Sequence, residues 1–160
     1  PAMTGSSKAI MILLMLVGGS PGSTAGGMKT TTFAVLILNA FSVCRKKDDA
    51  EVYGRRIDGS TVKNAVTVAV MYFLLFFIGG IVISTAEGLP LSTCLYETAS
   101  AVGTVGLTLG ITPQLGILSQ LILIVLMYLG RVGGLTLVYA AISNKNQSVA
   151  KLPLEKITVG

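Results

Sequence analysis

The sequence predicts an all-α integral membrane protein: a helix–pore-loop–helix repeat preceded by a broken helix. Of its 160 residues, 52% are hydrophobic and only 12% are charged, and the mean hydropathy is +0.78. A soluble domain usually carries roughly twice that charged fraction. Three apolar stretches, residues 9–43, 65–86 and 116–143, reach the roughly 20 residues that cross a bilayer as a helix. A short apolar segment that contains glycines lies between the last two stretches.

The first stretch, within residues 1–44, is expected to be one helix broken at residues 18–28. Two Gly-Gly pairs and a proline stand in the break, and both residue types disfavour continuous helix. The break is either a kink with a packing surface of small residues or an intramembrane loop whose glycines allow several conformations. A phosphate-binding loop is not indicated, because Met28 separates Gly27 from Lys29. The loop residues are Gly18, Gly19, Ser20, Pro21, Gly22, Ser23, Thr24, Ala25, Gly26 and Gly27.

Basic side chains gather in two regions, the linker over residues 45–63 and the tail over residues 144–160. The positive-inside rule places both regions in the cytoplasm, so residues 64–143 are expected to leave and re-enter across the membrane. Topology accounts for the net charge of +5 without a nucleic-acid partner. The linker also holds acidic residues, and it is either a solvated loop or a docking surface for a cytosolic regulator. The basic residues are Arg45, Lys46, Lys47, Arg55, Arg56, Lys63, Lys145, Lys151 and Lys156.

Between the last two stretches, residues 91–101 are predicted to form a re-entrant pore helix. As a helix the segment is only about 16 Å long, too short to span a bilayer. The filter candidates that follow are Gly103, Thr104, Val105 and Gly106. In a potassium-channel-like filter, backbone carbonyls replace the ion's hydration shell, and the C-terminal end of the preceding helix favours a cation. The alternative is a tight turn that joins two helices.

Two charged residues lie inside the apolar regions. Arg131 would cost about 2.5 kcal/mol or more in lipid, so it must face protein or water. It is expected either to pair with Glu97 or to place a positive charge in an ion path. Glu97, on the pore helix, is expected to brace the filter by accepting hydrogen bonds, and Glu87 to be a solvated helix end.

The residue inventory does not indicate an enzyme. The chain contains no histidine and only two cysteines, and no nucleophile–base pair is visible in the apolar segments. No metal site other than one for potassium is expected.

Three motifs, at residues 18–30, 96–107 and 128–134, together resemble the Trk/Ktr/HKT superfamily of potassium transporters, most closely its KtrB-like membrane subunits. The resemblance implies four consecutive helix–pore-loop–helix repeats, of which this chain holds the end of the third and the whole fourth. It implies that residues 18–27 form a gating loop. It also implies that Gly106 is the filter glycine and that Arg131 is a barrier in the pore.

The resemblance further implies a multi-pass protein of the plasma membrane that conducts K⁺ as a homodimer. A cytosolic ring of KtrA-like subunits would control the gate, with the nucleotide bound to that partner only, and Na⁺ is a candidate activator. The alternative is a secondary active symporter that couples K⁺ to Na⁺ or H⁺, because broken helices and midplane charges also mark such transporters.

Overall fold

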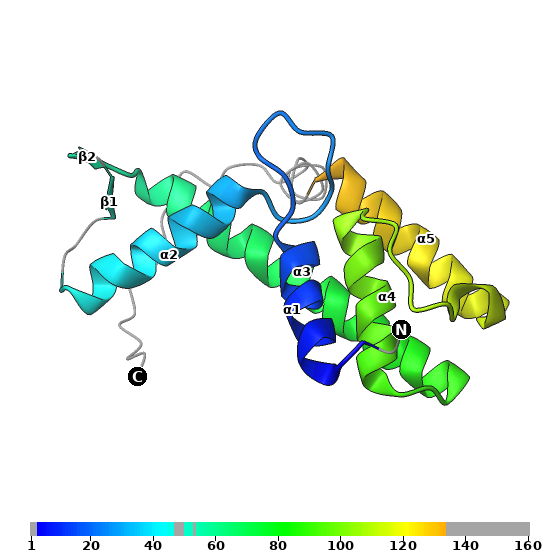
Figure 1. Ribbon diagram of the computed structural model, residues 1–160. Coiled ribbons are helices and arrows are strands. Elements are labelled where there is room, and N and C mark those ends of the chain that lie inside the picture. Colours follow the sequence, from blue (N-terminus) through cyan, green and yellow to red (C-terminus); the bar gives the residue numbers. More distant parts are fainter. Residues whose placement is uncertain (1–2, 47–49, 53, 134–160) are drawn as a thin grey trace, which may run out of the picture.

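A computed structural model of the chain describes residues 3–46, 50–52 and 54–133 (Figure 1). The all-α prediction is confirmed for these residues, apart from one short hairpin. The predicted tail, residues 144–160, and the last part of the predicted final span, residues 134–143, lie outside the described residues. The elements are α1 (Gly5–Leu16), α2 (Thr30–Cys44), β1 (Glu51–Val52), β2 (Arg55–Arg56), α3 (Gly59–Glu87), α4 (Leu91–Gly103), a 3₁₀ turn (Thr112–Gln114) and α5 (Ile117–Val132).

The short helix α4 lies at the centre of the packing, in contact with α1, α3 and α5 (Figure 1). Its second half is buried, and Thr98, Ala99 and Val102 have no exposed surface. Most side chains of this half are small, so the neighbouring helices can approach its backbone closely. The packing therefore makes α4 the core of the described chain.

Helix α3 is the one helix among the described residues that is long and apolar enough to cross a membrane. Its 29 residues extend about 43 Å at 1.5 Å per residue. Tyr72, Phe76 and Ile83 are buried on its inner face, whereas Phe73 and Ile78 are more than half exposed. The exposed face is apolar, as expected of a helix whose solvent is lipid.

Helix α3 begins at Gly59, within the predicted linker of residues 45–63. The cause is a helix cap. The carboxylate of Asp58 accepts a hydrogen bond from the Ser60 backbone N–H at 3.3 Å, which satisfies a donor that the first helical turn leaves free. A further hydrogen bond from the Ser60 hydroxyl holds the pKa of Asp58 below its usual value.

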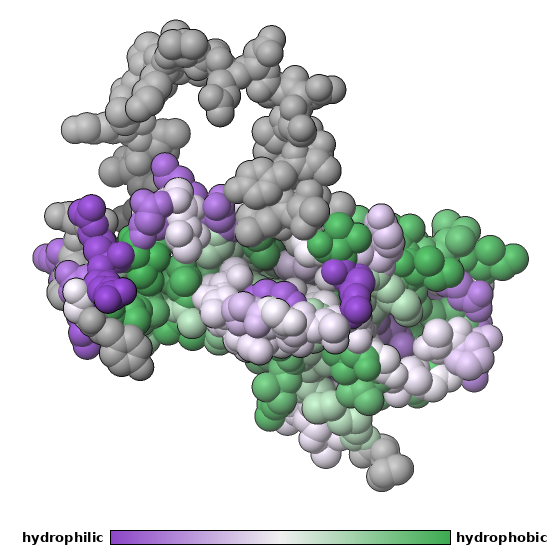
Figure 2. All heavy atoms as spheres, turned by 90° about the horizontal axis from the view of Figure 1, so that it is seen from above, coloured by the Kyte–Doolittle hydropathy of each residue, from purple (hydrophilic) through white to green (hydrophobic). Residues whose placement is uncertain are grey.

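Large apolar side chains cover much of the outer surface. Ile117 is 78% exposed and Leu13 is 66% exposed. Seen from the side of the connection between α1 and α2, strongly hydrophobic surface lies beside a paler central area (Figure 2). Monomeric soluble proteins rarely expose apolar patches of this extent, so this surface fits contact with lipid or with other membrane helices.

Candidate functional site

The connection between α1 and α2 is a loop that closes on itself. Val17 and Met28 form a parallel bridge. The Gly18 backbone N–H donates to the Met28 carbonyl at 2.7 Å, and the Met28 N–H donates to the Leu16 carbonyl at 3.2 Å. The two ends of the loop therefore lie side by side, and residues 18–27 arch above them (Figure 1). This geometry is a loop rather than a kink.

The far end of the loop contacts a filter candidate directly. The Gly26 backbone N–H donates to Thr104 Oγ1 at 2.8 Å, and the Gly27 N–H donates to the Gly130 carbonyl at 3.3 Å. A Cβ atom on Gly26 would lie 2.6 Å from both Thr104 Oγ1 and Thr104 Cγ2, closer than side-chain atoms pack. Only a glycine allows this contact between the loop backbone and Thr104.

Three backbones converge where the loop is docked. A Cβ atom on Gly103 would collide with the Met15 carbonyl of α1, and one on Gly130 would collide with the Val102 carbonyl of α4. Glycines at the ends of α4 and α5 therefore bring α1, α4 and α5 together at van der Waals distance. The loop docks on this junction.

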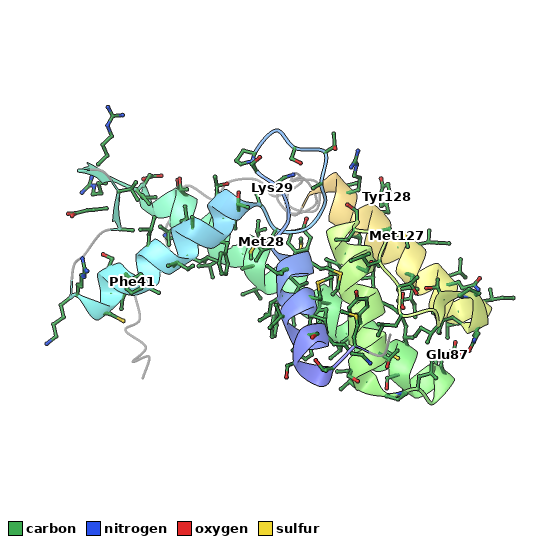
Figure 3. All side chains as sticks on the ribbon, in the orientation of Figure 1. Met28, Lys29, Phe41, Glu87, Met127 and Tyr128 are labelled. Atoms are coloured by element: carbon green, nitrogen blue, oxygen red, sulfur yellow. The ribbon has the colours of Figure 1, made fainter. Side chains whose placement is uncertain are left out.

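Two cationic side chains hold the loop carbonyls. The Lys29 ammonium donates to the Ser23 carbonyl at 3.1 Å and to the Ala25 carbonyl at 2.8 Å, and Figure 3 shows Lys29 beside the loop. The Arg131 guanidinium donates to the carbonyl of Thr24, which lies between these two residues. Three consecutive carbonyls thus point at positive charge, whereas the N–H groups of Gly26 and Gly27 face Thr104 and Gly130.

Glu97 and Arg131 do not pair in the described part of the chain, so of the two alternatives for Arg131 the ion pair with Glu97 is wrong. The Glu97 carboxylate is 4% exposed. It accepts hydrogen bonds from Thr108 Oγ1 at 2.7 Å, from the Leu109 N–H at 2.8 Å and from Thr112 Oγ1 at 3.0 Å. Glu97 therefore braces the segment that follows the filter candidates.

The four filter candidates lie at the C-terminal end of α4. Gly103 is the last residue of the helix, which extends two residues beyond the predicted pore helix of residues 91–101. Thr104 and Gly106 have positive φ angles of 52° and 83°. The Val105 N–H turns back to the Ser100 carbonyl at 2.9 Å. The chain reverses direction here, at the end of α4 that carries partial negative charge.

The docked loop lies level with the middle of α3. The Tyr72 hydroxyl donates to the same Gly130 carbonyl that accepts from Gly27, at 3.3 Å. Tyr72 stands about 20 Å from either end of α3, at 1.5 Å per residue. Loop, filter candidates and Arg131 therefore meet at the mid-height of the long apolar helix.

Sequence reasoning assigned Lys29 no contact within the loop, missed Tyr72, and placed Glu87 correctly at a helix end without foreseeing its contacts with α5. The Glu87 carboxylate accepts from the Gly116 N–H at 2.8 Å and from Ser119 Oγ at 2.5 Å, so it joins the end of α3 to the first turn of α5 (Figure 3). A carboxylate is favoured at a helix N-terminus. Gly116 ahead of an apolar run marked that N-terminus, but its nearness to Glu87 was not visible in the sequence.

A cleft of about 410 Å³ lies between the end of α4 and α5. It is lined by Glu97, Thr104, Gly106, Thr108, Leu123 and Met127, among others. Within the described residues, no group of three His, Cys, Asp or Glu side chains could hold a metal ion. The oxygen atoms of the filter candidates are backbone carbonyls and the Thr104 hydroxyl, which are neutral ligands suited to a transient monovalent cation.

Comparison with known proteins gives a consistent family match. The profile of the TrkH family, described as cation transport proteins, matches residues 2–150. The chain is 37% identical over 164 residues to the potassium/sodium uptake protein NtpJ of Enterococcus hirae, covering 99% of this chain and 36% of that protein.

Two further relatives are named as parts of Ktr systems. The chain is 35% identical over 149 residues to the Ktr system potassium uptake protein B of Bacillus subtilis, covering 93% of this chain and 33% of the relative. It is 32% identical over 151 residues to the protein of the same name from Vibrio alginolyticus, covering 94% and 33%. The chain thus spans about a third of the length of the curated relatives that it matches.

Proposed function

Because the chain belongs to the TrkH family of membrane cation transport proteins, which are not enzymes, we propose that it conducts K⁺ through a pore with a movable internal barrier. The observation that carries the proposal is the loop docked on Thr104 and Gly130, with Arg131 bound to its Thr24 carbonyl. A filter candidate, a glycine-rich loop and a fixed positive charge meet at one point.

Residues 103–106 would supply one strand of the filter. Their position at the C-terminal end of α4 supports this role, because the helix end contributes partial negative charge without a charged side chain. Glu97 holds the following segment by three hydrogen bonds, which supports a fixed backbone geometry. Such a filter selects ions by the number and direction of its carbonyl oxygens.

Residues 18–27 would be the gate, and Arg131 would be the charged part of the barrier. A unit positive charge about 5 Å from a K⁺ ion raises the electrostatic energy of the ion by about 3 kcal/mol at an effective dielectric constant of about 20. Arg131 and Lys29 both bind the docked loop. Docking therefore places two cations close to the proposed path, and undocking would remove the loop from it.

The proposed setting is a multi-pass protein of the plasma membrane, with the linker and the tail in the cytoplasm. The apolar outer surface supports a bilayer, and α3 supports one crossing. Relatives named after Ktr systems support a membrane subunit that works with other subunits. A KtrA-like cytosolic ring that carries the nucleotide, and a homodimer in the membrane, are part of this proposal. The exposed Arg55 and Asp58 of the linker are candidates for docking that ring.

The name of the Enterococcus hirae relative includes both potassium and sodium. Sodium is therefore the ion to test as an activator or as a coupled substrate. Uptake of K⁺ into vesicles at defined Na⁺ gradients separates the two roles. A symporter moves K⁺ against its own gradient when a Na⁺ or H⁺ gradient is imposed, whereas a conducting pore does not.

The proposed function is tested by K⁺ uptake of the complete transporter in a bacterial strain that lacks its own uptake systems. Arg131→Ala is expected to raise uptake several-fold with the preference for K⁺ over Na⁺ retained, because the fixed charge is lost. Arg131→Lys is the matched control, since it keeps the charge, and its uptake should stay near the parent value. Loss of uptake in Arg131→Ala with normal membrane insertion would contradict the barrier role.

A further inference from the structure

We infer that the Thr108 hydroxyl is a positioning group that sets the preference of the filter for K⁺ over Na⁺. The inference rests on the proposed function and deepens it, because it assigns the selectivity of residues 103–106 to a residue outside them. It starts from the path of the chain after α4. The chain turns at Thr104, where φ is 52°, and residues 105–111, the returning segment, run back between α4 and α5 (Figure 1).

The returning segment is tied to α4 at two points on either side of residues 106–107. At the first point, the Val105 backbone N–H donates to the Ser100 carbonyl at 2.9 Å. At the second point, the Thr108 hydroxyl donates to the Glu97 carboxylate at 2.7 Å. Within the part of the chain that the structure describes, residues 106–107 make no backbone hydrogen bond of their own. The direction of their carbonyls therefore depends on the two ties.

The two ties differ in what the sequence can change. The first tie joins two backbone groups, so a different side chain at Val105 would leave it in place. The second tie needs a hydroxyl at position 108. The residue type at position 108 therefore decides whether the filter end of the returning segment is held at both points or at one.

Thr108 is bonded on both sides of its oxygen. A threonine hydroxyl has one hydrogen and two acceptor lone pairs. The hydrogen goes to Glu97, and one lone pair accepts from the Gly110 backbone N–H at 2.9 Å. The hydroxyl thus fixes the returning segment to α4 and also fixes the bend at Gly110, where φ is 91°. Valine has nearly the same shape but would lose both hydrogen bonds.

Loss of the second tie should act on ion selectivity. A carbonyl filter distinguishes ions by the number and direction of its oxygens. A strand that is held at one point only can close around the smaller Na⁺ ion, which lowers the energy of Na⁺ more than that of K⁺. One hydrogen bond of ordinary strength corresponds to roughly a two- to tenfold change in such a preference.

Thr112 offers a matched control for a general loss of hydrogen bonds around Glu97. Its hydroxyl donates to the other carboxylate oxygen of Glu97 at 3.0 Å. Thr112 begins the 3₁₀ turn, four positions beyond Thr108, so its loss also costs Glu97 a donor but leaves both ties of the returning segment in place. Comparison of the two threonines separates the position of the filter strand from the stability of the network.

The test measures uptake of K⁺ and of Na⁺ by the complete transporter in lipid vesicles, together with thermal unfolding in detergent. Thr108→Val should lower the ratio of K⁺ to Na⁺ uptake by roughly two- to tenfold. Thr108→Ser keeps the oxygen and should keep the ratio of the parent. Thr112→Val should lower the unfolding temperature, as Thr108→Val does, but should leave the ratio unchanged. Thr108→Ala also lacks the oxygen and replaces the valine variant if that one fails to fold.

Two results would overturn the inference: a parent-like ratio in a folded Thr108 variant without the oxygen, or a ratio that falls as far in Thr112→Val as in Thr108→Val. Either result leaves the proposed function standing if K⁺ uptake still responds to Arg131→Ala. The proposed function itself fails if the complete transporter carries no K⁺, or if uptake ignores changes to both Arg131 and the loop. The two failures are therefore distinct.

Discussion

At the scale of single residues, the site depends on the absence of a side chain at Gly26. The backbone N–H reaches Thr104 Oγ1 only because nothing lies between them. The Gly130 carbonyl would also lie 3.0 Å from an added Cβ. Thr104 lies at the end of α4 and Gly130 lies in α5, and the packing of these helices holds both in place. With a side chain at position 26, the loop would therefore have to move.

Gly26→Ala is accordingly expected to undock the loop and raise basal K⁺ uptake. The comparison variant is Gly22→Ala on the same loop. Gly22 has a φ of 85° but no atom within 4 Å of an added Cβ, so alanine there brings backbone strain of about 1 kcal/mol without a collision. Uptake in the complete transporter should rise in Gly26→Ala much more than in Gly22→Ala. Equal uptake in both variants would show that the collision with Thr104 is irrelevant.

Glu97 shows how one buried carboxylate fixes a stretch of irregular backbone. All three of its partners are donors, two hydroxyls and one backbone N–H. An amide replaces the oxygen that accepts from Thr112 by a donor and removes the charge that strengthens all three hydrogen bonds, so the Thr112 hydroxyl must reverse and accept.

Glu97→Gln is therefore expected to lower the free energy of unfolding by about 1–3 kcal/mol and to weaken discrimination of K⁺ from Na⁺. Thermal unfolding in detergent and relative uptake of the two ions measure these effects. Glu97→Asp is a useful comparison, because it keeps two acceptors on a shorter stem. Unchanged selectivity with reduced stability would limit Glu97 to a structural role.

At the scale of elements, helix ends carry the architecture. Both ends of α5 receive hydrogen-bond partners from other elements, Glu87 at its start and the Gly27 N–H and the Tyr72 hydroxyl at its Gly130 carbonyl. The clearest case is Glu87, the last residue of α3. Its carboxylate accepts hydrogen bonds from the Gly116 N–H and the Ser119 hydroxyl at the start of α5. Ser119 is fully buried, so its hydroxyl depends on this carboxylate.

Removal of either partner is expected to destabilise the fold. Glu87→Ala and Ser119→Ala should each lower the free energy of unfolding by about 1–2 kcal/mol. The double variant should lose less than the sum, because the two residues share one interaction. Thermal unfolding of the four proteins gives the coupling energy. Strictly additive losses would mean that the contact contributes nothing of its own.

At the scale of the whole molecule, the level of the site along α3 is the most consequential feature. The Tyr72 hydroxyl and the loop share the Gly130 carbonyl, and Tyr72 is near the middle of α3. In the proposed transporter, a loop docked at the middle of the apolar helix α3 lies where the dielectric constant is low and a fixed charge acts strongly.

This placement predicts a depth profile along the exposed face of α3. Spin labels at Val66, Phe73 and Ile81, all exposed, should show the greatest contact with oxygen dissolved in lipid at Phe73. The reason is that Phe73 lies next to Tyr72, level with the docked loop. Paramagnetic accessibility in lipid vesicles measures this profile. A maximum at Ile81 would place the loop nearer one surface and weaken its role as a barrier at the bilayer centre.

The sequence by itself determined the class of the protein, the interruption after the first helix and the short glycine-flanked helix. These properties follow from local chemistry: apolar runs, glycine and proline in a helix, and segment length. The family also follows from the sequence, because its motifs are local. Residues 18–27, 103–106 and Arg131 were all singled out on these grounds.

Only the tertiary structure decided which of these groups touch. Gly26 and Thr104 are 78 positions apart, and Arg131 lies 107 positions from Thr24. A pair with Glu97 was one of the two alternatives for Arg131, but Glu97 is already satisfied by hydroxyls and an N–H close to it in the chain. Arg131 takes a loop carbonyl because the glycine junction brings α5 against the loop. Such contacts depend on how closely backbones approach, which the packing of α1, α4 and α5 sets and no local pattern encodes.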